Sequence, residues 1–287
     1  MFKPDLLSGR IACITGGGSG LGLSMAKRFA ELGAKIVILG RNPDRLAQGA
    51  QAIGEAGQGR EAATFACDVR DYESVTRTMN EIEQQVGLPH VLVNNAAGNF
   101  LAASEDLSPG GFDAIVKIVL YGTFNCTHAL ANKWIAALRP GTILNIVATY
   151  ADNGSAFVLP SACAKAGVLT MTRSLAVEWA TYNIRVNAIA PGPFPTAGAW
   201  QRLLPTKEIE ENARQRIPSR RFGKHEELSN LAAFLVAEGA DFITGECVAI
   251  DGAEALAGAG QFSSFMNMDR PQLKGMLRMM KAMAGKG

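Results

Sequence analysis

The chain has few of the residues that build metal sites and disulfide frameworks. Only three of its 287 residues are histidines, and they lie far apart, with no cysteine or carboxylate at the spacing of a metal site. Its five cysteines are an odd number and are scattered, mostly through apolar runs. We therefore predict no metal site, no disulfide framework and a reducing compartment.

Long apolar runs and an excess of one charge are also missing. No apolar run approaches the roughly 20 residues of a membrane span, and the first five residues are too polar for a signal peptide. The net charge of +2 argues against a nucleic-acid-binding protein, although a small polyanionic ligand stays possible. We expect no nucleic-acid partner, no integral membrane association and, with no targeting signal visible, a cytoplasmic location.

The chain does have a regular alternation of short apolar runs and amphipathic stretches, which is typical of parallel βαβ units. Strands are predicted at 10–15, 35–39, 62–67, 90–94, 142–147, 184–190 and 246–250. Helices are predicted at 21–32, 43–53, 72–86, 112–138, 160–181 and 226–237. The prediction is one α/β domain over residues 1–287, a single doubly wound parallel sheet with helices on both faces. Residues 191–217 are expected to be an irregular, proline-rich substrate loop, and residues 261–287 a C-terminal extension.

A glycine-rich turn, Thr-Gly-Gly-Gly-Ser-Gly-Leu-Gly at residues 15–22, follows the first strand and opens a helix. Missing side chains let the backbone approach a pyrophosphate, and the helix N-terminus offers free N–H groups, so this context predicts a Rossmann fold that binds a dinucleotide. The end of the second strand has no acid to hold a ribose hydroxyl and carries Arg41 instead, which favours NADP(H). Arg41 as a solvated loop residue, and Asp68 as a helix cap rather than an adenine contact, remain the alternatives.

These features resemble the short-chain dehydrogenase/reductase family over residues 8–252. The motifs that carry the resemblance are residues 15–22, Asp68, 94–98, the helix of Lys165, 184–187, 191–193 and 251–252. The family's usual Tyr-x-x-x-Lys is broken here, because Ser161 occupies the tyrosine slot. Ala148 replaces the usual serine, and Val119 the usual catalytic asparagine. Either the site is inactive or another acid has been recruited.

The departures are similar to those of the mitochondrial-type 2,4-dienoyl-CoA reductases within this family. That branch carries Asn-Asn-Ala-Ala-Gly-Asn-Phe, found here at residues 94–100, a tyrosine after the fifth strand, matched by Tyr150, and an arginine in the substrate loop, matched by Arg202. Tyr121 departs from the pattern, because the branch carries asparagine there. The resemblance implies NADPH-dependent reduction of 2,4-dienoyl-CoA to 3-enoyl-CoA, with an acyl-CoA substrate and a homotetramer formed through residues 112–138 and 160–181.

The resemblance also implies roles for individual residues. Tyr150 and Asn99 would donate hydrogen bonds to the thioester oxygen, Lys165 would bind the nicotinamide ribose, and Ser161 would orient Lys165. The predicted cofactor contacts are Gly16, Gly17, Gly18, Ser19, Gly20, Leu21, Arg41, Asp68, Asn95, Lys165, Pro191, Gly192, Pro193 and Phe194. The predicted substrate contacts are Arg41, Phe100, Ser108 and Arg202.

Several alternatives stay open at this point. Tyr150 is otherwise a packing aromatic, Asn99 an Asx-turn residue and Ser161 a helix-start residue. The Met-rich, basic C-terminal extension is either a lid over an acyl chain or an amphipathic helix packed on its own core or a neighbouring subunit. The rival functions are reduction of a 3-oxoacyl thioester or another carbonyl, and nucleotide binding without catalysis.

Overall fold

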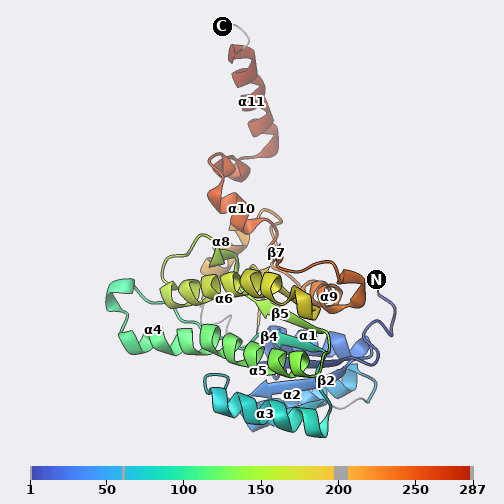
Figure 1. Cartoon of the computed structure of the whole chain (residues 1–287). Helices are drawn as coiled ribbons and strands as arrows, with labels where there is room; N and C mark the ends of the chain where they lie inside the picture. The colour runs from blue at the N-terminus through green and yellow to red at the C-terminus, as the bar shows by residue number, and fades with distance from the viewer. Residues whose placement is uncertain (1, 60–61, 197–205, 285–287) are drawn as a thin grey trace.

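Seven parallel strands form one sheet in the order β3-β2-β1-β4-β5-β6-β7 (Figure 1). The strands are β1 (Ile11–Thr15), β2 (Lys35–Gly40), β3 (Ala63–Ala66), β4 (Val91–Asn94), β5 (Gly141–Ile146), β6 (Ile184–Pro191) and β7 (Cys247–Ile250). The winding direction reverses between β1 and β4, which lie side by side. The computed structural model describes residues 2–59, 62–196 and 206–284. The predicted single, doubly wound parallel sheet is confirmed.

Helices cover both faces of the sheet because its central strands are buried on both sides; all six residues of β5 are buried. On one face α1 packs against α2 and α9, and on the other α3 packs against α5 and α4 against α6 (Figure 1). Separate clusters of buried side chains fill the two faces, one including Phe29 and the other Trp134. These helices are α1 (Gly20–Glu31), α2 (Pro43–Ala56), α3 (Tyr72–Gln85), α4 (Pro109–Val116), α5 (Gly122–Ala136), α6 (Leu159–Glu178) and α9 (His225–Val236).

Helices α4 and α5 run on from each other through one π-helical turn, η2 (Lys117–Tyr121). Within the described residues the combined helix, Pro109–Ala136, is long and apolar enough to cross a membrane by length and composition. However, 56% of its apolar window is buried inside the domain, and core helices of globular proteins meet the same requirement. Its apolar character is explained by packing: Trp134 is buried, and a Cβ on Gly141 would lie 2.2 Å from the indole ring.

A buried chain of polar side chains joins β4 and β5 to the helices above them. Asn94 Nδ2 donates to Thr127 Oγ1 of α5 and to Asn145 Oδ1 of β5, each at 2.9 Å. Asn145 Nδ2 in turn donates to Thr172 Oγ1 of α6. Because buried amides are costly to leave unpaired, this chain fixes α5 and α6 relative to the strand ends where ligands of such folds bind.

Part of the loop predicted to be irregular is a helix, α8 (Lys207–Arg216). The Thr206 hydroxyl caps it by accepting a hydrogen bond from Ile209 N. Acidic residues lie in its first turn and Arg214 and Arg216 in its last turn, which suits the helix dipole. The prediction was wrong here because the prolines on either side concealed these capping signals.

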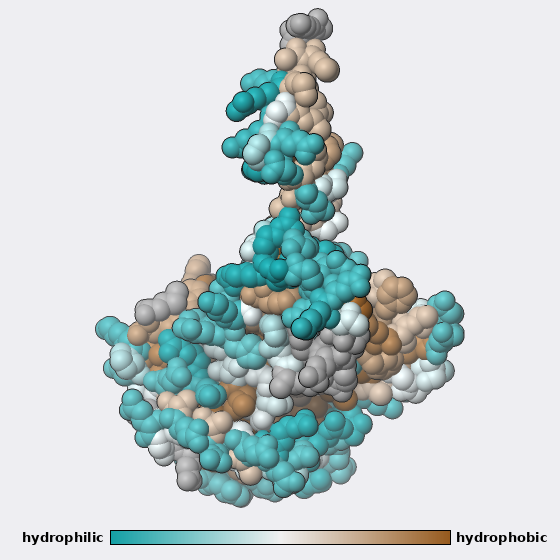
Figure 2. All heavy atoms as spheres, turned by 180° about the vertical axis from the view of Figure 1, so that it is seen from behind, coloured by the Kyte–Doolittle hydropathy of each residue, from teal (hydrophilic) through white to brown (hydrophobic). Residues whose placement is uncertain are grey.

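After β7 the chain leaves the sheet through α10 (Glu254–Ala259), η6 (Ser263–Asn267) and α11 (Arg270–Ala284), and Figure 1 shows α11 projecting away from the domain. Helix α11 is amphipathic, with polar side chains along one side and apolar ones along the other (Figure 2). Leu273 is buried at its base, whereas Leu277, Met280 and Met283 are exposed. The chain therefore departs from the sheet before residue 261, where the extension was expected to start.

Candidate functional site

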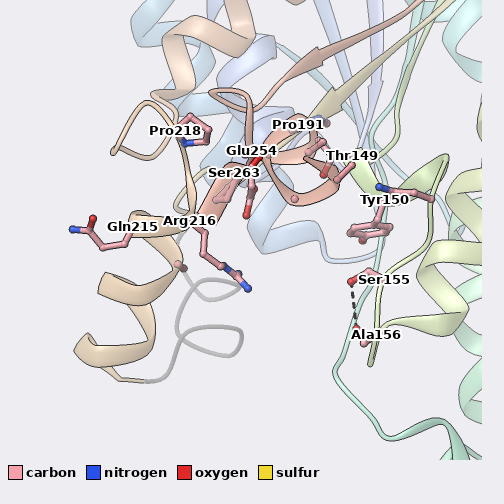
Figure 3. A pocket seen from close by; sticks show the side chains of 18 of the residues that line it. Thr149, Tyr150, Ser155, Ala156, Pro191, Gln215, Arg216, Pro218, Glu254 and Ser263 are labelled. Carbon is pink, nitrogen blue, oxygen red and sulfur yellow. Dashed lines mark hydrogen bonds between the residues drawn. The ribbon is translucent and has the colours of Figure 1, made fainter. Parts of the chain in front are cut away.

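Two cavities adjoin the C-terminal ends of the strands and share Pro191 and Thr196 in their walls. The inner cavity, of about 510 Å³, is lined by the glycine-rich turn, by the ends of β2 and β3, and by Lys165. The outer cavity, of about 1170 Å³, is lined by Asn99, Tyr150, the end of α8 and the chain after β7 (Figure 3). A site at this edge, next to the reversal between β1 and β4, is where a doubly wound sheet binds ligands.

The glycine-rich turn forms an open cradle at the N-terminus of α1. Gly16 and Gly20 have φ of 66° and 56°, a conformation that favours glycine. The Ser19 side chain makes no cap hydrogen bond to the N–H groups of the first turn, and Ser19, Gly20 and Leu21 line the inner cavity. Uncapped N–H groups at a helix start provide an anion site.

Not every predicted glycine faces the inner cavity. Gly16 and Gly18 line it, but Gly17 is buried against β2, where a Cβ would lie 2.4 Å from Ile38 Cγ2. Asn95 lines the cavity and also braces the turn, because its Nδ2 donates to Thr15 O and Gly16 O. The close packing at Gly17 lets the turn lie flat on β2.

Two guanidinium groups lie on the β2 side of the inner cavity. Arg41 follows β2 and Arg45 lies in the first turn of α2; both are exposed, and neither guanidinium hydrogen-bonds to another described residue. Arg41 was predicted from the sequence, whereas Arg45 was not, because its only signal was its position four residues after Arg41. Two such cations suit a ribose phosphate, because guanidinium groups bind phosphate through charge-assisted hydrogen bonds.

Asp68, at the end of β3, lines the same cavity but is already paired. Arg70 Nη2 lies 2.5 Å from Asp68 Oδ2, and Arg70 NH groups also bond Oδ1. These hydrogen bonds hold the pKa of the Asp68 carboxyl below its usual value. The adenine contact expected of Asp68 remains a prediction. The carboxylate that would make this contact also binds Arg70.

Lys165 is buried on α6 at the floor of the inner cavity. Its Nζ donates to Ile146 O at the end of β5, at 2.5 Å. Burial lowers the pKa of this ammonium to about 8. The fixed position allows its remaining N–H groups to donate to a ligand in the cavity.

The Tyr150 hydroxyl lies 3.0 Å from Ser161 Oγ, and either oxygen can be the donor. Tyr150 belongs to the short turn η3 (Thr149–Ala151) after β5, whereas Ser161 is one helical turn before Lys165 on α6. Ser161 is buried, and Tyr150 is half-buried and lines the outer cavity (Figure 3). The phenol from the β5 turn therefore reaches the helix position at which the family's usual tyrosine is missing.

Asn99 lines the outer cavity, as Tyr150 does, and is exposed. Its Oδ1 accepts a hydrogen bond from Phe100 N at 2.9 Å, while its Nδ2 donates to no described residue. The local turn and the catalytic role are therefore compatible, because binding the oxygen to the backbone leaves the amide NH₂ as a donor.

The predicted substrate residues are dispersed. The Ser108 hydroxyl caps α4 by accepting from Gly111 N, and Phe100 lies near Gly111; neither is among the described residues that line the inner or the outer cavity. Arg202 lies outside the described residues, and Arg41 lines the inner cavity only. Arg216 and Arg220, which the sequence interpretation missed, line the outer cavity instead, and Figure 3 shows the Arg216 side chain at the end of α8.

The Pro-Gly-Pro-Phe turn after β6 divides the two cavities. Pro191 lines both, whereas Gly192, Pro193 and Phe194 line the outer one, although all four were predicted to contact the cofactor. A Cβ on Gly192 would lie 2.6 Å from Asp251 Cβ, so the turn packs directly against the end of β7. The turn therefore forms part of the boundary between the two cavities, at Pro191.

Comparisons with known proteins agree with this geometry. A sequence profile for a family described as "Enoyl-(Acyl carrier protein) reductase" matches residues 16–253. A Bacillus subtilis protein described as a probable (2E)-enoyl-CoA-producing 2,4-dienoyl-CoA reductase is 43% identical over 244 residues, which are 85% of this chain and 95% of that protein. A Caenorhabditis elegans protein described as a probable (3E)-enoyl-CoA-producing 2,4-dienoyl-CoA reductase is 41% identical, over 88% of this chain and 83% of its own.

Solved structures give the same result. A short-chain dehydrogenase from Bacillus anthracis is 40% identical with a TM-score of 0.78, and covers 88% of this chain and 98% of its own. A gluconate 5-dehydrogenase from Burkholderia cenocepacia, solved with NADP and tartrate, is 32% identical with a TM-score of 0.82 over 88% of this chain and 98% of its own.

A relative from Arabidopsis thaliana, 39% identical over 88% of this chain and 86% of that protein, is described as a peroxisomal 2,4-dienoyl-CoA reductase.

Proposed function

Because the chain belongs to the short-chain dehydrogenase/reductase family and has 2,4-dienoyl-CoA reductases among relatives up to 43% identical, we propose that it is an NADPH-dependent reductase of 2,4-dienoyl-CoA thioesters with 3-enoyl-CoA as product. The observation that carries this proposal is the Tyr150–Ser161 contact, which puts a phenol beside the Lys165 helix without using the family's usual tyrosine position.

The inner cavity fits NADP(H). The uncapped start of α1 suits the pyrophosphate, and Arg41 and Arg45 suit a 2′-phosphate where an NAD enzyme would carry an acid. Lys165, fixed by Ile146 O, would hold the nicotinamide ribose. When bound, the cofactor supplies the hydride.

Tyr150 and Asn99 carry the electrostatic part of the mechanism. As the far end of the conjugated diene accepts hydride, negative charge develops on the thioester oxygen. The Tyr150 hydroxyl and Asn99 Nδ2 would both donate to that oxygen, each contributing about 3–4 kcal/mol if it acts as an oxyanion-hole donor. Ser161 acts as a positioning residue that holds the phenol.

The carbon of the dienolate that receives the proton decides which product forms. Protonation at the α carbon yields the 3-enoyl thioester, and protonation at the γ carbon yields the 2-enoyl thioester. Tyr150 supports the first outcome, because a donor bound to the thioester oxygen lies nearer the α carbon than the γ carbon. Analysis of the product by mass spectrometry and NMR distinguishes the two.

Displacement of the acid from helix to loop favours this reaction over carbonyl reduction. A ketone reductase needs its acid at the carbonyl oxygen, one bond from the carbon that receives hydride, whereas in a dienoyl thioester hydride and oxyanion lie several bonds apart. The test compares NADPH oxidation with sorbyl-CoA and with acetoacetyl-CoA. Faster turnover of the ketone would favour a 3-oxoacyl reductase, and no turnover of either with intact NADPH binding would favour nucleotide binding alone.

The proposal includes a homotetramer formed through the helices at 109–136 and 159–178. Exposed apolar side chains on these helices support it, namely Tyr121, Phe124 and Val177, with exposed fractions of 54%, 46% and 80%. Light scattering gives the oligomeric state. A cytoplasmic location stays a prediction, which fractionation of the source cells would test.

A further inference from the structure

We propose that residues 254–267, which form helix α10 and turn η6, are the wall against which the acyl tail of the thioester lies, and that they set the chain lengths the enzyme accepts. The proposal rests on the proposed function. It concerns a segment outside the family profile, which ends at residue 253, so no property of the matched region assigns it a role.

This segment lines the same cavity as the proposed catalytic groups. Tyr150 and Asn99 line the outer cavity, and so do Ala255, Ala257, Gly258 and Ala259 of α10. Ser263 and Met266 of η6 line it as well. A substrate whose thioester reaches Tyr150 therefore meets this wall with another part of its length.

The chemistry of the α10 part of the wall suits methylene groups rather than phosphates, whereas η6 adds the polar residues Ser263, Ser264 and Asn267 beside Met266. Helix α10 reads Glu-Ala-Leu-Ala-Gly-Ala, and its one charged residue is an acid, Glu254. An acid repels the phosphates of CoA, whereas alanine and glycine offer a smooth apolar surface with room for a chain. Burial of each methylene on such a surface improves affinity roughly fourfold.

The wall is held in place at both ends. At its start the Asp251 carboxylate accepts hydrogen bonds from Ala253 N and Ala255 N, at 2.9 and 2.8 Å. At its end Arg220 Nη2 donates to Met266 O at 3.0 Å. Fixation of this kind lets a segment discriminate by size, because an oversized chain cannot displace it cheaply.

Gly258 provides a sharp test. It lines the outer cavity, is exposed, and a Cβ added there would have no atom within 4 Å, so the backbone at this part of the wall accepts a side chain. Gly275 of α11 is equally open but lines no described cavity, and Gly275→Met is the matched control. The measurement is kcat/KM of Gly258→Met and Gly258→Phe with 2,4-dienoyl-CoAs of six to fourteen carbons.

We expect a loss that grows with chain length: less than about twofold for the six-carbon substrate, and roughly tenfold or more for twelve carbons and above, equivalent to about two or more methylenes no longer buried. Gly275→Met should match wild type throughout. An equal loss at all lengths would overturn the proposal, because the CoA portion would then lie on α10. Unchanged length dependence in both Gly258 variants would overturn it as well.

A binding measurement separates this proposal from the proposed reaction. Calorimetric titration with butyryl-CoA and dodecanoyl-CoA needs no turnover. If wild type reduces no dienoyl-CoA yet binds the longer thioester more tightly, and Gly258→Met removes that preference, the wall stands and the reaction assignment fails. If neither protein distinguishes the two thioesters, the wall itself is wrong.

Discussion

The Tyr150 hydroxyl lies 3.0 Å from Ser161 Oγ, although the two residues come from a turn after β5 and from helix α6. The serine fills the sequence slot of the usual acid, and in the proposed mechanism the tyrosine would supply the acid from a neighbouring element. The position of the phenol thus depends on two elements packing correctly, rather than on one helix.

Replacing Tyr150 by Phe should remove most dienoyl reduction. The loss of one oxyanion donor lowers kcat by about 10²–10³-fold, while the Kd for NADPH stays unchanged, because Tyr150 lines the outer cavity only. Stopped-flow NADPH oxidation and fluorescence titration measure the two quantities. Tyr182→Phe, an exposed tyrosine away from both cavities, is the control. Retention of wild-type kcat in Tyr150→Phe would exclude the assigned role.

Ser161→Ala should have a smaller effect that depends on Tyr150. A single hydrogen bond contributes roughly 0.5–1.5 kcal/mol, so kcat should fall between about twofold and tenfold. In the Tyr150→Phe background the same change should have no further effect, since its partner is gone. A double-mutant cycle tests this dependence, and additive losses would mean that Ser161 acts independently of the phenol.

Arg41→Ala and Arg45→Ala should each weaken NADPH binding without weakening NADH binding. A charge-assisted hydrogen bond contributes about 1.5–3 kcal/mol, so a loss of roughly 10- to 100-fold in Kd is expected. Arg77→Ala on α3, where the arginine pairs with Glu73, is the control. Equal weakening of both dinucleotides would place the guanidinium groups on the pyrophosphate instead.

Stability should depend on pH through Lys165, whose pKa falls from 10.5 to about 8 on folding because it is buried. Between these values the unfolded chain holds a proton that the folded one has lost, so the free energy of unfolding rises with pH. The rise, on the order of 3 kcal/mol, is complete near pH 10.5, and below pH 8 the burial of the charge opposes folding. Urea unfolding of wild type and Lys165→Met between pH 7 and 10.5 checks this. The free energy of unfolding of wild type should rise relative to that of Lys165→Met as pH rises, and a difference that is constant with pH would contradict the prediction.

Much of the fold was predictable because parallel strands and their covering helices leave strong local patterns. The run at Ile36 has no alternation, and strand β2 is indeed buried on both faces. The glycine-rich turn and Lys165 could also be recognised from the sequence, because each belongs to a motif contained in one short segment. Helix α8 was missed where prolines lie close to its capping signals.

The rest of the site depends on contacts between segments that are distant in the sequence, and no local sequence pattern predicts these contacts. Ser108 was expected to contact substrate, yet its hydroxyl satisfies a backbone N–H at the start of α4, a local demand that competes with binding. No sequence pattern marks Arg45 or Arg216 as a site residue, because each is a single cation on an exposed helix face. Only the fold places the first near β2 and the second at the outer cavity.

The family profile ends at residue 253, and the chain beyond it completes the outer cavity. In genetic terms, the codons for hydride transfer and those for part of the substrate boundary occupy separate stretches of the gene. A deletion, recombination or frameshift in the codons that follow residue 253 would alter that boundary and spare Tyr150, Lys165 and the dinucleotide cradle. Exchange of this stretch between homologous genes is thus a short evolutionary route to a new substrate range.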